Sequence, residues 1–170
     1  FIEPDGELYR SILKWKKKIS KIMPNQAFCS HPPHCTLIHT KIRNEEKALN
    51  ELENILCQKV SFELKVNETG IFWNDIATGG HTLYLKIKSD KKIYDLQLSI
   101  AKSLKYIIKK SNNPNYVMKN HVLKESFDNY GFPFIGSHWI PHLTIASLKV
   151  DKINPIITDF QFWQPNCILK

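Results

Sequence analysis

PHCTL at residues 33–37 and PHLTI at residues 141–145 share one pattern, in which Pro-His-x-Thr is followed by an apolar residue. At this composition roughly 0.3 His-x-Thr matches are expected by chance in the whole chain. Requiring the preceding proline and the following apolar residue lowers that expectation to below about 0.01. The doubled pattern is therefore treated as a feature of the fold and not as coincidence.

Each copy of the pattern has the composition of a β-strand with two different faces. Residues two apart on a strand point the same way, so His34 and Thr36 are expected to project together, as are His142 and Thr144. The residues between and after them would then face the core, namely Cys35, Leu37, Leu143 and Ile145. The alternative is a hydrogen-bonded histidine at the end of a core strand, with threonine present for its β-propensity.

Two imidazoles and two hydroxyls in one place suit chemistry at a phosphodiester. Histidine titrates nearest neutral pH, so one ring can accept a proton while the other donates one. Threonine hydroxyls donate hydrogen bonds to anionic oxygens without titrating themselves. Acid and base exchange roles when a reaction reverses, so the pattern does not say which histidine is the base.

Length and composition predict one domain over residues 1–170. The chain is 42% hydrophobic and 24% charged, which is ordinary for a domain with a sizeable core. No apolar run approaches the roughly 18 residues of a membrane helix, and no signal-peptide pattern opens the chain. We therefore expect a cytoplasmic monomer that is not bound to a membrane. A nuclear location is the alternative. The first residue is Phe1 and not Met, which indicates a trimmed start, and a leader segment that has been removed is an alternative.

The cysteines and histidines do not form a metal-binding motif. The four cysteines follow no zinc spacing and are too few for a disulfide scaffold, so free thiols are expected. His31, His34 and His39 form a local cluster, but Pro32 and Pro33 impose an extended backbone that keeps these histidines off a shared helix face. We expect no metal and no cofactor.

The net charge of +8 and the pI near 9.3 favour an anionic partner. Lysines concentrate in residues 14–21 and 102–110. Both groups fall on expected helices, where a solvated polar face is the more common explanation.

Hydrophobic periodicity predicts the order of the elements. Helices are expected at 7–22, from the Asn44 cap to about 56, and at 90–110. Strands are expected at 34–42, 60–66 continuing near 71–73, 81–88, 140–148 and within 160–169. Residues 111–138 are rich in Asn, Gly, Pro and aromatics, and they are expected to be a long loop that covers a site.

The paired motifs, with histidines 142 − 34 = 108 residues apart, resemble those of the two-histidine phosphoesterase superfamily, in particular its 2′-5′ RNA ligase-like and cyclic phosphodiesterase branch. The likeness covers nearly the whole chain, with residues 1–2 similar to the end of that family's first strand and residues 160–169 similar to its closing strand. It implies a two-lobed α+β fold. Two small antiparallel sheets would form a concave cleft with flanking helices and pseudo-twofold symmetry, each lobe giving one motif.

The resemblance also implies residue roles. His34 and His142 would be the catalytic acid and base, Thr36 and Thr144 would hold the phosphate oxygens, and no metal would be needed. The substrate would be a nucleotide or an RNA end carrying a 2′,3′-cyclic phosphate or a 2′-5′ linkage. A 2′-5′ RNA ligase, a 3′-end exonuclease of the same family and a non-catalytic RNA-binding module are the alternatives.

Four further residues are candidates for contact with the substrate. Phe28 and Trp139 lie shortly before the two motifs, where a ring could stack on a nucleobase. Tyr84 and Lys86 share a strand face with Thr82 and could reach the cleft. Core packing, or an exposed strand face for the second pair, is the alternative for each.

Overall fold

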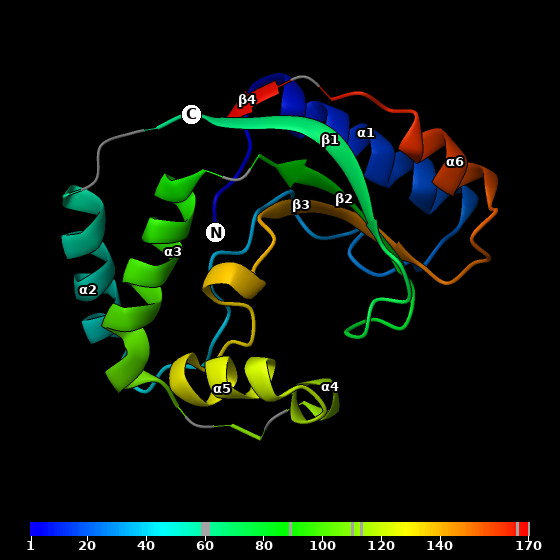
Figure 1. Cartoon of the computed structure of the whole chain (residues 1–170). Coiled ribbons are helices and arrows are strands. Elements are labelled where there is room, and N and C mark those ends of the chain that lie inside the picture. Colours follow the sequence, from blue (N-terminus) through cyan, green and yellow to red (C-terminus); the bar gives the residue numbers. More distant parts are fainter. Residues whose placement is uncertain (59–61, 89, 110, 113, 166, 170) are drawn as a thin grey trace. The chain divides into compact units, whose positions relative to one another are not determined.

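The computed structural model describes residues 1–58, 62–88, 90–109, 111–112, 114–165 and 167–169 (Figure 1). The chain divides into two compact units, and each unit is built from separate stretches of sequence. Unit 1 contains residues 1–36, 63–88 and 141–170, and unit 2 contains residues 37–62 and 89–140. All four residues of the two His-x-Thr motifs therefore belong to unit 1.

Unit 1 is built on an antiparallel sheet with the strand order β3-β2-β1-β4. The strands are β1 (Leu64–Phe72), β2 (His81–Ile87), β3 (His142–Leu148) and the short edge strand β4 (Cys167–Leu169). The predicted apolar face of β2 is confirmed, because Leu83, Leu85 and Ile87 are fully buried. Burial does not alternate along the strand, however, since Thr82 and Tyr84 on the opposite face are buried as well. The opposite face carries Tyr84 and Lys86, which pair across the ladder with Thr144 and His142 of β3.

Two helices of unit 1, α1 (Gly6–Ile22) and α6 (Pro155–Gln161), cover the apolar face of this sheet (Figure 1). In α1 the buried positions recur at helical spacing and include Leu8, Ile12 and Ile19, as predicted. Helix α6 begins where the Asn154 side chain accepts a hydrogen bond from the backbone N–H of Ile156, and Pro155 occupies the first turn. Within this unit, helices therefore cover only one face of the sheet.

Unit 2 is mainly helical. It contains α2 (Glu45–Cys57), α3 (Lys91–Leu104), α4 (Asn115–Met118) and α5 (His121–Tyr130), with short 3₁₀ turns at Lys105–Ile107 and Gly136–His138. The predicted cap of α2 is confirmed, because the Asn44 side chain accepts from the backbone N–H of Lys47 at 2.8 Å. The amide of Gln97 is fully buried and holds the core of the unit together by donating to the carbonyls of Leu37 and Phe134.

Several predicted elements were wrong. The expected loop at 111–138 contains α4 and α5, because Asn120 caps α5 and Gly131, at φ 62°, ends it in the left-handed conformation. The expected strand at 160–169 is divided between the end of α6 and β4, and the helix expected at 90–110 ends at Leu104. The strand expected at 60–66 begins at Leu64 and runs without a break to Phe72, while residues 60 and 61 lie outside the described residues.

The strand expected at 34–42 is replaced by isolated bridges. Cys35 pairs with Ile2, and Ile42 pairs with Ile108, but no ladder extends from either pair. The mixed helix-and-strand class is confirmed, whereas the described residues form one open sheet and not the two sheets that the resemblance implied. The described helices include none that is both long and apolar enough to span a bilayer.

Candidate active site

The first motif is held in extended backbone by two hydrogen bonds. The Cys35 N–H donates to the Ile2 carbonyl at 2.7 Å, and the Ile2 N–H donates to the Cys35 carbonyl at 2.9 Å. The Nδ1 of His34 lies 2.8 Å from the Pro32 carbonyl oxygen. A carbonyl only accepts, so Nδ1 carries the hydrogen and Nε2 of the neutral ring carries the free lone pair. This tautomer leaves His34 ready to take or return a proton at Nε2.

Both motifs show the same alternation of burial. Cys35, Leu143 and Ile145 are completely buried and Leu37 nearly so, whereas both histidines and both threonines are partly exposed. The alternation predicted from the sequence is confirmed, even though the first motif pairs only through a single bridge. Each histidine is therefore presented beside the threonine of its own motif.

A direct contact joins the two motif segments. The backbone of His142 hydrogen-bonds the thiol of Cys35, although Cys35 precedes His142 by more than a hundred residues. Burial raises the pKa of this thiol to about 12, and the bond from His142 only partly offsets the effect. Cys35 is therefore a packing residue between the motifs and not a nucleophile.

We expect Cys35 to resist thiol reagents in the folded protein. At pH 8 a thiol with this pKa is ionised in only about one molecule in 10⁴, while Cys57 is exposed. Titration with a chromogenic disulfide should give the same number of fast-reacting thiols for the native protein and for Cys35→Ser. In denaturant the variant should show one thiol fewer. A fast native thiol that disappears in Cys35→Ser would contradict this assignment.

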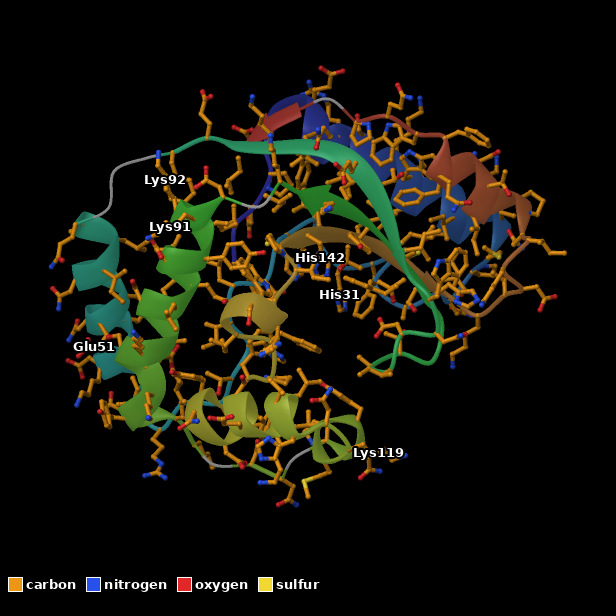
Figure 2. All side chains as sticks on the ribbon, viewed as in Figure 1. His31, Glu51, Lys91, Lys92, Lys119 and His142 are labelled. Atoms are coloured by element: carbon orange, nitrogen blue, oxygen red, sulfur yellow. The ribbon has the colours of Figure 1, made fainter. Side chains whose placement is uncertain are left out.

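The second histidine lies at the start of β3 (Figure 2), and two aromatic rings contact it. The His142 ring meets Phe72 at a centroid distance of 5.1 Å and Tyr84 at 5.3 Å, both edge to face. Phe72 and Tyr84 are themselves stacked at 4.1 Å. This three-ring cluster fixes the imidazole on the face of the sheet that α1 and α6 leave uncovered. His34 has a smaller counterpart, because the Phe1 ring lies 4.4 Å from it.

Tyr84 can occupy its place because the facing residue of β1 is glycine. A Cβ on Gly70 would fall 2.3 Å from the Cζ of Tyr84, so the phenol lies directly over the bare backbone. Burial raises the pKa of Tyr84, while Lys86 lowers it and Glu68 raises it further. The hydroxyl therefore stays protonated as a donor at neutral pH. Lys86 forms a half-exposed ion pair with Glu68 at 3.2 Å.

The two rings expected to stack on a nucleobase, Phe28 and Trp139, lie in different units and differ in exposure. Phe28 is partly exposed in unit 1 and meets His31 edge to face at 5.6 Å. Trp139 belongs to unit 2, where it is buried against Tyr94, whose hydroxyl donates to the Trp139 carbonyl. These contacts are typical of core packing, which is the alternative stated above for Trp139. The candidate site therefore does not include Trp139.

Sequence reasoning missed Phe1, Phe72 and Gly70. Their role depends on which residues face each other across strands, and strand register is not visible in a local pattern. The described part of the chain contains no group of three or more His, Cys, Asp or Glu side chains arranged to hold a metal ion.

Comparison with known proteins identifies a family. A family model described as the 2'-5' RNA ligase superfamily matches residues 11–168, a span that includes both motifs and the whole of β1, β2 and β3. No curated protein matches the chain.

Proposed function

Because the chain belongs to the 2'-5' RNA ligase superfamily, we propose that it is a metal-independent phosphodiesterase acting on a nucleotide or an RNA end. The scissile group would be a 2′,3′-cyclic phosphate or a 2′-5′ linkage. The observation that carries the proposal is the contact between the motif segments at Cys35 and His142, with a partly exposed His-Thr pair on each segment.

The proposed reaction uses the two histidines as acid and base. For a cyclic phosphate, one neutral imidazole takes a proton from water as the water oxygen bonds to phosphorus. The bond from phosphorus to one ribose oxygen breaks, and the other imidazole, initially protonated, gives its proton to that oxygen. His34 suits either role, because its Nδ1 is already committed to Pro32 and its Nε2 exchanges the proton.

The hydroxyls supply the electrostatic part of the mechanism. Thr36 and Thr144 would donate to the non-bridging oxygens, where negative charge grows in the transition state. Tyr84 lies against His142 and keeps its proton at neutral pH, so it offers a further donor on the same face. Lys86 is the register partner of His142 across the ladder, with its charge balanced by the ion pair to Glu68, and Phe28 offers a partly exposed ring in the segment before His34.

A substrate panel tests the proposal. Purified protein should hydrolyse at least one member of a set of 2′,3′-cyclic nucleotides, 2′-5′ and 3′-5′ oligonucleotides and ADP-ribose cyclic phosphate, with EDTA present throughout. The rate should follow a bell-shaped pH profile, since one imidazole must be neutral and the other protonated. Product analysis by chromatography separates cleavage from joining of RNA ends, the activity expected of a ligase.

Two results would count against the proposal. An absolute requirement for a divalent cation would remove the metal-free mechanism. Tight binding of RNA with no turnover on any panel member would favour the non-catalytic RNA-binding module.

A further inference from the structure

Lys16 is a charged side chain in an apolar position. It lies on the buried stripe of α1, between Ile12 and Ile19, and only 3% of its surface is exposed. It is the only Lys, Arg, Asp or Glu that is buried among the described residues. Burying an ammonium group is costly unless hydrogen bonds replace its water, so its partners are informative.

Both partners are backbone carbonyls, and they come from the two motif-bearing segments. The Nζ of Lys16 donates to the Phe28 carbonyl at 2.6 Å and to the Ile145 carbonyl at 2.9 Å. Phe28 lies six residues before His34, and Ile145 is the last residue of the second motif. One ammonium group therefore joins the approach to the first motif with the strand that carries the second.

A backbone contact and a strained residue accompany this junction. The Ser147 N–H donates to the Ala27 carbonyl at 2.9 Å, so residues 27 and 28 run beside β3. Phe28 has φ 67°, a left-handed conformation that is unfavourable for a bulky residue. Such a conformation persists only where its surroundings hold it, and the bond from Lys16 to the Phe28 carbonyl is one such restraint.

The Lys16 side chain has the charge and the donors needed to hold both carbonyls. Burial lowers its pKa to about 8, with Cys29 nearby raising it slightly. At pH 7 the group is therefore mostly an ammonium with three donors, and two of these are accounted for by the carbonyls.

We infer that Lys16 is a positioning residue for the proposed reaction, because it fixes the segment before His34 against the strand that carries His142 and Thr144. The inference rests on the proposed function. A displacement of one motif relative to the other would misalign the acid and the base, and shifts of about 1 Å in such groups can be costly to rate.

The test compares Lys16→Met, which keeps the length without donors, with Lys16→Arg, which keeps the donors. Lys17→Met is the matched control, because Lys17 is the exposed neighbour on the same helix. On the best substrate of the panel, Lys16→Met should lower kcat at least about tenfold. KM should change by no more than about threefold, because the displacement acts mainly on the alignment of the acid with the base, which matters in the transition state more than in substrate binding. Lys16→Arg should recover most of kcat, and Lys17→Met should match the unmodified protein.

Amide hydrogen exchange gives a readout that needs no activity. In Lys16→Met the Ser147 amide should exchange at least about tenfold faster, while amides of the central strand β2 stay protected. If the Met variant does not fold, Lys16→Gln, which keeps two N–H donors on a shorter, uncharged side chain, should show the same changes to a smaller extent.

Three outcomes would overturn the inference. In the first, Lys16→Met has a lower melting temperature but an unchanged kcat at an assay temperature well below that melting point. Lys16 would then only stabilise the fold. In the second, exchange at Ser147 is unchanged in Lys16→Met. In the third, Lys16→Arg is no better than Lys16→Met. A wild-type protein inactive on the whole panel would instead refute the proposed function, and the exchange experiment would still decide whether Lys16 joins the two segments.

Discussion

Replacing either His34 or His142 by alanine should lower the rate of phosphodiester cleavage by about 10² to 10⁴, the usual contribution of a positioned acid or base. The fold should survive, because both histidines are partly exposed and neither belongs to the core. Steady-state kinetics on the best panel substrate gives the rate, and thermal unfolding gives the fold. His39→Ala is the matched control, because this exposed histidine lies close to the first motif in the sequence and belongs to neither motif.

The double variant, with both His34 and His142 replaced by alanine, should be little slower than either single one, since residues that act as a unit do not contribute additively. Thr36→Ala and Thr144→Ala should each cost less, because they remove one hydrogen-bond donor and spare both proton-transfer groups. Full activity in the double histidine variant would refute the mechanism.

Gly70→Ala should cost about 10²-fold in rate, although the residue carries no functional group. The added methyl would fall 2.3 Å from the Tyr84 ring, which must then move by more than about 1 Å to restore ordinary contact. Tyr84 is stacked on Phe72, and both rings contact His142, so this movement reaches the imidazole. Overpacking should also lower the free energy of unfolding by about 1–3 kcal/mol.

A double-mutant cycle isolates the cause. In a Tyr84→Ala background the three atoms nearest the added methyl, all from the Tyr84 side chain, are gone, so the further loss of rate and stability from Gly70→Ala should nearly vanish. If Gly70→Ala costs the same in both backgrounds, the loss arises from the β1 backbone and not from the ring cluster.

The sequence predicted those features that depend on local pattern. The buried Leu8, Ile12 and Ile19 of α1, the Asn44 cap of α2 and the apolar face of β2 depend only on neighbouring residues, and all three are confirmed. The alternation of both His-x-Thr motifs was equally predictable, because it needs only extended backbone with one side buried.

Features that depend on distant partners were not predictable in the same way. A β-branched run such as residues 34–42 cannot show whether a partner strand exists, and here it has only isolated bridges. The three-ring cluster at His142 depends on the register of β1, β2 and β3, which is shifted by an irregularity at Leu83 and Tyr84. Helix α5 is a different case, since its Asn120 cap and its terminal Gly131 are local signals, but the surrounding Asn, Gly, Pro and aromatic residues are equally typical of a loop.

The position of β3 at the edge of the sheet has a consequence for solubility. An edge strand normally offers unpaired N–H and C=O groups to which a strand of another molecule can add. In the described part of this chain, three such groups on β3 are occupied by partners outside the sheet. The Cys35 thiol bonds the backbone of His142, the Lys16 ammonium bonds the carbonyl of Ile145, and the Ala27 carbonyl accepts from Ser147. The contacts that hold the motif segments together thus also block intermolecular strand addition, so damage to them would favour aggregation as well as loss of activity.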